Sequence, residues 1–282
     1  MCSKKVFNSA PLPFMGQKRR FIKDFKEALA QFEEVDVIVD LFGGSGLLSH
    51  VAKHERPDAR VIYNDFDYFC ERVANVETTN EILARIRVLL KDTAQDKKVP
   101  EPLRSKVLEA IKEYDAKGYV DYLTLGSSLL FSGKWVNSYE GLAKHTMYNC
   151  VKQLDYCVDG YLDGLEIVHK DYKELFTEYK DNKRVLFLID PPYLSTEVGA
   201  YKCYWKLRDY LDVLNCLRDT NYIYFTSEKS QVIELCKWIR ENPDLKDPFE
   251  NAEMRVQNNK ISYCAGFADI MLVKQNGCKL VS

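Results

Sequence analysis

Short apolar runs alternate with longer stretches of helical spacing in both terminal parts of the chain. The runs of buried-strand type occupy residues 35–41, 61–65, 165–169, 186–189 and 222–226. Stretches with apolar side chains on one helical face occupy residues 18–32, 171–179, 205–219 and 231–241. This alternation predicts a mostly parallel sheet with helices on both faces. Residues 254–257 and 267–274 predict an antiparallel pair that closes the sheet.

The middle of the chain follows a different pattern. From residue 66 to residue 165 the spacing is mostly helical, and we expect helices at 71–91, 102–114, 120–130 and 142–157. A loop at residues 131–139 mixes aromatic, cationic and amide side chains. The pattern predicts one α/β domain formed by residues 1–65 and 166–282, interrupted by a helical insertion at 66–165.

Composition narrows the class of protein. The chain is 46% hydrophobic and 29% charged, as in globular proteins generally. It has no stretch resembling a signal peptide and no apolar run near the ~18 residues of a membrane span. We therefore expect a cytoplasmic protein without a membrane partner. The nine cysteines form no CxxC pair, and we expect them to be reduced and packed as small hydrophobes.

A pair of histidines tests whether the chain binds a metal. His50 and His54 lie four residues apart, a spacing that can hold an ion. The zincin pattern also requires Glu after the first histidine, and Val51 stands there. We therefore expect two solvent-facing histidines and no metal site.

A glycine loop follows the first strand. Asp40 ends that strand, residues 42–46 read Phe-Gly-Gly-Ser-Gly, and a helix is expected from Leu47. In such an arrangement small residues let backbone approach a nucleoside-bearing ligand. Asp65 ends the second strand, where a carboxylate suits ribose hydroxyls. The loop does not read GxGxxG and indicates no pyrophosphate site, so S-adenosylmethionine fits better than NAD. The sulfonium of S-adenosylmethionine is attracted to carboxylates and aromatic faces.

A third motif, Asp190-Pro191-Pro192-Tyr193, ends the strand at 186–189. Its prolines stop the strand in a stiff turn at the carboxyl end, where open α/β sheets bind ligands. The Asp190 carboxylate and the Pro191 carbonyl can accept N–H bonds from a planar exocyclic amine, which frees its lone pair. Tyr193 offers a face for a stacked base. A turn that merely contains Asp and Pro is the alternative, and all four residues after a buried strand disfavour it.

Charge distribution bears on nucleic-acid binding. The net charge of −2 neither supports nor excludes DNA, but residues 1–30 carry seven Lys or Arg against two acids. We expect Arg19 and Arg20 to contact phosphates. In the loop at 131–139, the candidates for contacting bases or wedging the duplex are Lys134, Trp135 and Asn137. Packing of Trp135 could equally be what holds that loop.

Taken together, the motifs resemble the Dam-like, alpha-group DNA adenine methyltransferases. The resemblance rests on an order of motifs: Pro-Phe-Met-Gly-Gln-Lys at 13–18, the glycine loop, Asp65, a long insertion, and the turn at 190–193. It implies a Rossmann-like class I methyltransferase fold with a mixed seven-stranded sheet and a helical target-recognition insertion. It also implies methyl transfer from S-adenosylmethionine to a flipped adenine in double-stranded DNA, and it makes a cognate restriction endonuclease a candidate partner.

The resemblance assigns roles to individual residues. The implied cofactor site consists of Phe14, Gly16, Lys18, Asp40, Phe42, Gly44, Gly46, Asp65 and Asp190. The implied catalytic group consists of Asp190, Pro191, Pro192 and Tyr193. The family usually has Trp in the place of Phe14 and Gly in the place of Gln17, so contacts there are expected to differ. The insertion is only loosely alike, and the recognition sequence does not carry over.

Other substrates remain open on the residues alone. The same turn could methylate cytosine N4 or an adenine in RNA. Glutamine-amide methyltransferases of proteins resemble Asn-Pro-Pro-Tyr, which Asp190 disfavours. A non-catalytic DNA-binding component of a restriction-modification system could retain the fold, although the intact Phe14, Lys18, Asp65 and Asp190 argue against that loss of function.

Overall fold

The computed structural model describes residues 6–131, 134–192, 206–228, 230, 232–242, 246–262 and 265–276. The chain forms two compact units. The first comprises Met1–Ser9, Gln17–Asp67 and Leu162–Ser282, and the second comprises Ala10–Gly16 and Tyr68–Tyr161. Residues 10–16 thus belong to the second unit, whereas the sequence pattern grouped them with the α/β domain. Tyr193 and the loop expected at 194–203 lie outside the described residues.

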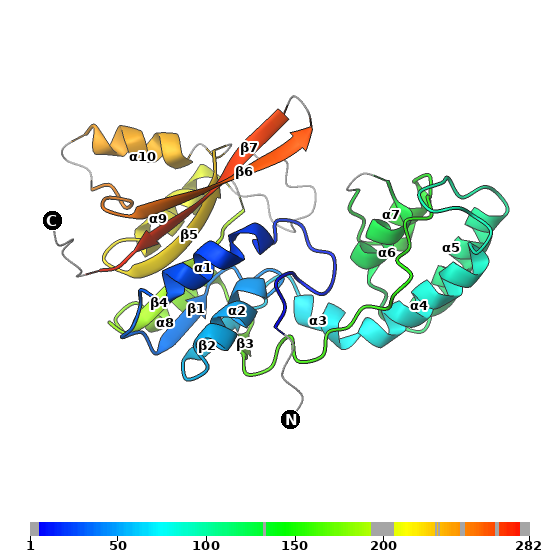
Figure 1. Cartoon of the computed structure of the whole chain (residues 1–282), viewed down its shortest axis with the longest axis horizontal. Helices are drawn as coiled ribbons and strands as arrows, with labels where there is room; N and C mark the ends of the chain where they lie inside the picture. The colour runs from blue at the N-terminus through cyan, green and yellow to red at the C-terminus, as the bar shows by residue number, and fades with distance from the viewer. Residues whose placement is uncertain are drawn as a thin grey trace. The chain divides into compact units, whose positions relative to one another are not determined.

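One seven-stranded sheet forms the frame of the first unit, in the order β3-β2-β1-β4-β5-β7-β6 (Figure 1). The strands are β1 (Val37–Asp40), β2 (Arg60–Asn64), β3 (Glu166–Val168), β4 (Val185–Ile189), β5 (Asn221–Ser227), β6 (Glu253–Ser262) and β7 (Ala265–Lys274). Strands β1 to β5 run parallel, and β7 is antiparallel to both β5 and β6. The predicted mixed, mostly parallel sheet is confirmed. Its order reverses between β1 and β4, the switch point where such sheets bind ligands.

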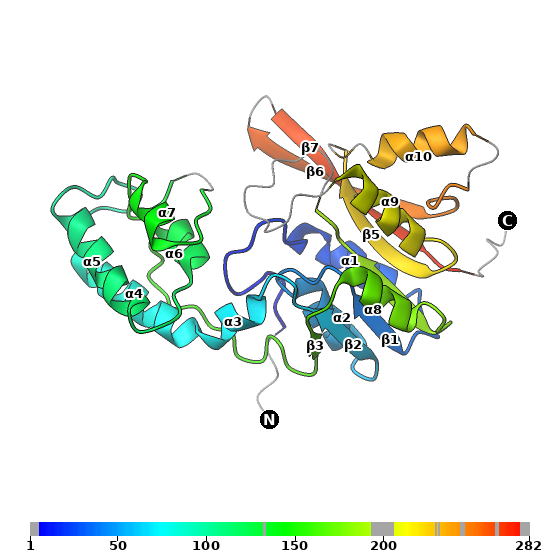
Figure 2. The same ribbon diagram turned by 180° about the vertical axis from the view of Figure 1, so that it is seen from behind.

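Helices cover both faces of this sheet (Figures 1 and 2). A short 3-10 helix, η1 (Arg19–Phe21), leads into α1 (Ile22–Leu29), which packs on one face with α2 (Leu47–Glu55). The other face carries α8 (Tyr172–Tyr179), α9 (Leu207–Cys216) and α10 (Val232–Arg240).

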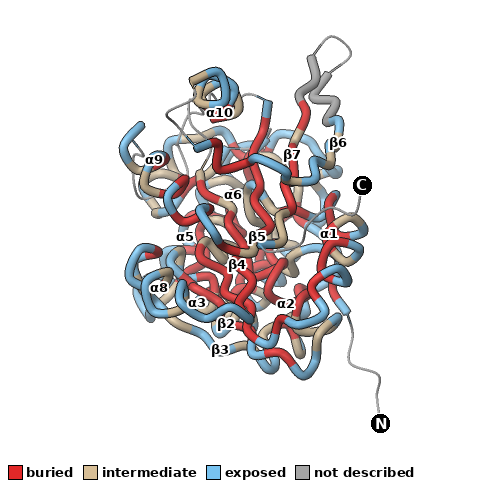
Figure 3. Tube along the Cα trace, turned by 90° about the vertical axis from the view of Figure 1, so that its left-hand side faces the viewer, coloured by how far each residue is buried: buried red, intermediate tan, exposed pale blue. Residues whose placement is uncertain are grey.

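Strand β4 has no solvent-facing side, because all five of its residues are buried. Phe187 and Ile189 enter one apolar layer, and Leu186 and Leu188 enter the other. The same burial runs along the neighbouring central strands, drawn red in Figure 3. This explains why the strand reads as a continuous apolar run.

The second unit contains α3 (Phe69–Ala74), α4 (Val76–Leu89), α5 (Leu103–Asp115), α6 (Tyr122–Leu129) and α7 (Tyr139–Ala143). The single helix expected at 71–91 is divided at Asn75, whose backbone lies outside the helical region. Across the described ranges of both units, no helix combines the length and apolar character needed to cross a membrane.

The helix expected at 142–157 was wrong. Only α7 forms there, and it ends at Ala143. Beyond it the backbone bonds to distant segments: Tyr148 N–H donates to the Leu129 carbonyl at 2.8 Å, and Asn149 N–H to the Lys97 carbonyl at 2.9 Å. These long-range bonds satisfy backbone groups that a helix would have paired locally.

Candidate active site

Lys18, Asp40 and Asp190 come together at the carboxyl ends of β1 and β4. Lys18 precedes η1, and its Nζ donates to Oδ2 of Asp190 at 2.5 Å. The same Nζ lies 5.8 Å from the centroid of the Phe225 ring. The Lys18 side chain is 7% exposed and that of Asp190 is 18% exposed. The ion pair therefore fixes the carboxylate while leaving part of it accessible.

Asp40 is a buried acid beside this pair. Its Oδ2 accepts a hydrogen bond from Ser49 Oγ at 2.7 Å, while its Oδ1 has no hydrogen-bond partner among the described residues. Burial raises the pKa of Asp40 to about 7; the Ser49 hydrogen bond opposes this rise and the charge of Asp190 adds to it. Burial also raises the pKa of Asp190, against the opposing effect of Lys18. The cluster holds more acid than base, so it favours a nearby cation.

The turn after β4 is fixed from the neighbouring helix. Pro191 is buried and Pro192 half-buried. The hydroxyl of Tyr210 in α9 donates to the Pro192 carbonyl. Sequence reasoning missed Tyr210, because only its helical spacing marks it and that spacing indicates core. The stacking role of Tyr193 stays a prediction.

The glycine loop turns the chain from β1 into α2. Gly44 and Gly46 have φ angles of 50° and 72°, in the left-handed region that favours glycine. Gly46 precedes the first residue of α2, and its carbonyl accepts from His50 N–H at 2.8 Å. Phe42 is half-buried, with its ring centroid 4.9 Å from that of Tyr172. The predicted strand, glycine loop and helix are confirmed.

A buried amide holds Asp65 at the same edge of the sheet. Nδ2 of Asn64 donates to the Leu41 carbonyl at 3.1 Å and to the Lys170 carbonyl at 3.0 Å, and its Oδ1 accepts from Lys170 N–H at 3.0 Å. Asn64 thereby ties the ends of β1, β2 and β3 together. Asp65 itself is 6% exposed, and its N–H donates to the Val168 carbonyl at 2.9 Å. Sequence reasoning missed Asn64, although a polar residue between an apolar run and an acid marked it.

An aromatic pair lies next to Asp65. His169 Nδ1 is 2.8 Å from the Asp65 carbonyl oxygen, and because that oxygen can only accept, Nδ1 carries the proton. The His169 ring stacks on Phe66 with centroids 5.4 Å apart and planes 7° apart. Phe66 is exposed. The sequence pattern singled out neither ring.

Two predicted cofactor residues, Phe14 and Gly16, belong to the second unit. The Phe14 ring meets Phe69 of α3 edge-on at 5.8 Å, and Gly16 has a φ of 81°. The carbonyl of Pro13, the residue before Phe14, accepts from Arg72 Nη2 at 2.8 Å. Arg72 also pairs with Asp121, Nε to Oδ2 at 3.0 Å, with both side chains buried. The ion pair fixes Arg72, which in turn holds the loop at 10–16 through the Pro13 carbonyl. No sequence motif indicated this pair.

The predicted DNA-binding residues lie on two surface segments. Arg19 and Arg20 are exposed in η1, in the first unit. In the second unit Lys134 and Asn137 are exposed and Trp135 is half-buried.

The segment carrying Lys134 and Asn137 is anchored at Val136 and Ser138. Val136 is buried against α6, where a Cβ added to Gly126 would lie 2.9 Å from Val136 Cγ2. Ser138 accepts from Gly141 N–H and caps α7. Packing thus holds the loop chiefly through Val136, and Lys134 and Asn137 stay exposed. DNA binding by these side chains stays a prediction.

The expectation of two solvent-facing histidines was wrong for His50. It is buried in α2, and its Nε2 accepts the Phe7 N–H at 3.0 Å, which ties the start of the chain to the first unit. Its ring lies 4.5 Å from that of His54. Among the residues that the structure describes, no group of three or more His, Cys, Asp or Glu could hold a metal ion.

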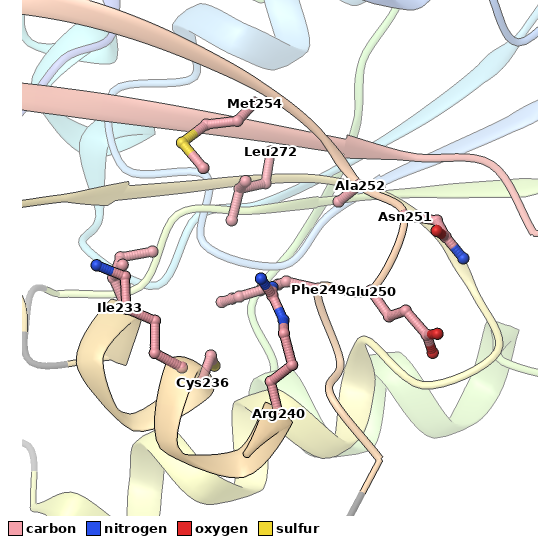
Figure 4. Close-up of a pocket in the computed structure, with 10 residues that line it drawn as sticks. Ile233, Cys236, Arg240, Phe249, Glu250, Asn251, Ala252, Met254 and Leu272 are labelled. Carbon is pink, nitrogen blue, oxygen red and sulfur yellow. The ribbon is translucent and has the colours of Figure 1, made fainter.

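A separate hollow of about 440 Å³ lies beside α10, against the β6 and β7 end of the sheet (Figure 4). Its lining includes the buried Cys236, Phe249 and Leu272 and the exposed cations Lys237 and Arg240. Arg240 is held by Asp247, with Nη2 to Oδ2 at 2.7 Å. None of the sequence-predicted site residues lines this hollow.

The chain matches the model of the D12 class N6 adenine-specific DNA methyltransferase family over residues 14–239. A Haemophilus influenzae protein named "Putative methyltransferase" is 39% identical over 287 residues, covering 97% of this chain and 95% of that protein.

Two solved structures align over most of the chain with low similarity. Precorrin-6y C5,15-methyltransferase from Geobacter metallireducens has 9% identity and a TM-score of 0.39, covering 98% of this chain and 100% of that one. An Escherichia coli structure titled "Putative methyltransferase yhhF" has 12% identity and a TM-score of 0.30, covering 94% of this chain and 92% of that one.

Proposed function

Because the chain belongs to the D12 class N6 adenine-specific DNA methyltransferase family, we propose that it methylates the exocyclic amine of an adenine in double-stranded DNA, using S-adenosylmethionine. One observation carries the proposal beyond family membership. Lys18, Asp40 and Asp190 meet at the switch point of the sheet, where a ligand is expected.

The residues at this edge suit the cofactor. When bound, S-adenosylmethionine supplies an electrophilic methyl group on a positively charged sulfur. Asp40 and Asp190 favour a positive charge nearby, and Asp40 Oδ1 is a buried oxygen with no hydrogen-bond partner among the described residues. Asp65 is held at the same edge, and its carboxylate suits ribose hydroxyls.

Asp190 suits the target amine. Lys18 engages Oδ2 of Asp190 and holds the carboxylate in one orientation. The other oxygen and the Pro191 carbonyl are the acceptors that we assign to the amino N–H groups. Because both are already in place, positive charge that develops on the amine nitrogen is stabilised without reorganisation.

A stacked adenine does not reach acceptors that lie at a recessed turn, so the base must leave the duplex. Extrusion of a paired base costs a few kcal/mol. In this proposal, contacts of the exposed cations with phosphates and of the 134–137 segment with bases offset the free-energy cost of extrusion. The recognition sequence is set by the second unit in this proposal.

The test is transfer of a tritiated methyl group from S-adenosylmethionine to duplex DNA, followed by digestion to nucleosides. We expect label in N6-methyldeoxyadenosine, with Asp190→Ala as the inactive control. Label in N4-methyldeoxycytidine, or transfer to RNA alone, would replace the proposed substrate. Absence of transfer to a broad set of duplex sequences, with the control protein folded, would contradict the proposal.

A further inference from the structure

Tyr63 lies beneath the glycine loop and fills the space that the loop leaves. It is the fourth residue of β2, fully buried, and its register partner in β1 is Asp40. A Cβ added to Gly43 would lie 2.2 Å from Tyr63 Cε2, and one added to Gly46 would lie 3.3 Å from Tyr63 Cζ. The Tyr63 ring and the Asn64 carbonyl, 2.8 Å from the same added Cβ, therefore leave room only for glycine at position 43.

Two acceptors among the described residues lie within reach of the single proton of the Tyr63 hydroxyl. Its oxygen is 2.8 Å from the Gly44 carbonyl oxygen and 3.1 Å from Oδ1 of Asp65. Both partners can only accept when the carboxyl is ionised, so the proton serves one of them at a time or is shared. One buried side chain thus connects the floor of the glycine loop to the carboxylate that suits a ribose.

We propose that Tyr63 is a positioning residue that sets how strongly Asp65 selects a cofactor with an intact ribose. The inference rests on the proposed function, because it concerns the cofactor site of that reaction. When ribose hydroxyls donate to Asp65, the Tyr63 proton turns to the Gly44 carbonyl. The carboxylate then accepts from the ligand in a fixed orientation, and no buried donor is left unpaired.

The test is calorimetric binding of S-adenosylhomocysteine and of its 2′-deoxy and 3′-deoxy forms to the full chain and to Tyr63→Phe. This variant keeps the ring and removes only the hydroxyl. For the unaltered chain we expect the weaker of the two deoxy forms to bind ~10-fold less tightly than the parent, because it lacks a hydrogen bond to a charged group. In Tyr63→Phe we expect that ratio to fall to about 3-fold or less.

Tyr222→Phe is the matched control. Tyr222 is a fully buried tyrosine of β5 in the same unit, and its hydroxyl donates to the Pro248 carbonyl at 2.9 Å. We expect a comparable fall in melting temperature in both variants and an unchanged ribose ratio in Tyr222→Phe. A merely structural role for Tyr63 would lower the melting temperature without changing that ratio.

The outcomes separate this inference from the proposed function. If the unaltered chain binds the ligand and methylates DNA, but Tyr63→Phe keeps the full ribose ratio, only the role of Tyr63 is overturned. The role of Tyr63 is also overturned if Tyr63→Phe and Tyr222→Phe both lower the ribose ratio, because a general loss of rigidity in the first unit would then explain the change. If the unaltered chain binds none of the three ligands, the proposed function and this inference are both overturned.

Discussion

Each unit of the molecule contains an ion pair with a buried cation, and the two pairs differ in how far the carboxylate is exposed. In the first unit Lys18 and Asp190 meet at 2.5 Å, and the Asp190 side chain is 18% exposed. In the second unit Arg72 and Asp121 meet at 3.0 Å, and the Asp121 side chain is 1% exposed.

Asp121 accepts hydrogen bonds from residues of its own unit. It accepts from Arg72 Nε, from Thr124 Oγ1 at 2.6 Å and from Thr124 N–H at 3.1 Å, and the bond from Thr124 N–H caps α6. Lys18, by contrast, engages one oxygen of a carboxylate that remains partly exposed. An ion pair whose carboxylate is fully buried and engaged by donors of its own unit is therefore scaffold, while one whose carboxylate stays partly accessible is available to a substrate.

The largest expected effect comes from breaking the scaffold pair. Arg72→Met leaves the Asp121 charge buried without its cation, so the free energy of unfolding should fall by ~3–5 kcal/mol. Urea denaturation measures it. Arg85→Met is the control, because Arg85 pairs with Glu113 at the surface of the same unit, where solvent screens the pair and its removal should cost much less. Equal destabilisation of the two variants would remove the distinction between scaffold and surface pairs.

Breaking the accessible pair should affect catalysis instead. Asp190→Asn keeps the shape of the side chain but removes the charged acceptor, so methyl transfer should fall by ~100-fold or more. The initial rate with labelled cofactor is the measurement, and circular dichroism confirms the fold. Asp212→Asn serves as control, because Asp212 pairs with Lys173 at the surface of the same unit. Near-normal turnover by Asp190→Asn would disprove the catalytic assignment.

Asp40, beside the Lys18–Asp190 pair, should make the free energy of unfolding depend on pH. Its pKa is about 7 in the folded chain against an ordinary 3.8, so it binds its proton more tightly when folded. Its contribution to stability is therefore complete below pH ~4 and is lost as the pH rises through 7. Relative to the unaltered chain, Asp40→Asn should gain at least ~1.4 kcal/mol of unfolding free energy between pH 4 and pH 7.5, the equivalent of one pKa unit.

Urea unfolding at several pH values in this interval measures the difference. Asp219→Asn is the control, because Lys246 lowers the pKa of the exposed Asp219 through a hydrogen bond, so the contribution of Asp219 to stability is lost only as the pH falls below about 4 and changes little over this interval. Its effect should be smaller because exposed pairs are screened by solvent. Parallel curves for Asp40→Asn and the unaltered chain would show that burial does not raise the pKa of Asp40.

The smallest effects per residue concern the exposed cations of the two units. Replacing Arg19 and Arg20 with Ala should weaken binding to all duplexes alike and lower the salt slope by ~0.9 for each phosphate that the variant no longer neutralises. Replacing Lys134 or Asn137 should instead change the preference among sites by ~1–3 kcal/mol. Affinity measured against salt, for cognate and scrambled duplexes, distinguishes them. If replacing Arg19 and Arg20 changed the preference among sites, and replacing Lys134 or Asn137 did not, the proposed roles of the two segments would be reversed.

The elements at the sheet edge could be predicted because each is encoded locally. Asp40, Asp65 and Asp190 each follow a short apolar run, and a parallel sheet brings such ends to one edge. The spacing thus located the acids and the glycine loop, and the strand order of the structure confirmed the sheet.

The remaining features depend on contacts between distant parts of the sequence. Arg72 and Asp121 are 49 residues apart, and nothing near either one indicates its partner. The irregular backbone after α7 has helical spacing, yet its hydrogen bonds to Lys97 and Leu129 compete successfully with a helix. The sequence pattern indicated only that Tyr63 is a strand residue, because the Gly44 carbonyl and the Asp65 carboxylate come within reach of its hydroxyl only in the folded sheet.

The hydrogen bond from Arg72 to the Pro13 carbonyl has a consequence for recombination between relatives. The second unit is discontinuous along the chain, since it comprises Ala10–Gly16 as well as Tyr68–Tyr161. A chimera that exchanged residues 68–161 alone would pair a foreign helical unit with the native 10–16 loop. In the proposed function the second unit sets the recognition sequence, so an exchange of specificity requires both pieces to move together. The modular boundary of this protein is a pair of segments rather than a single insertion.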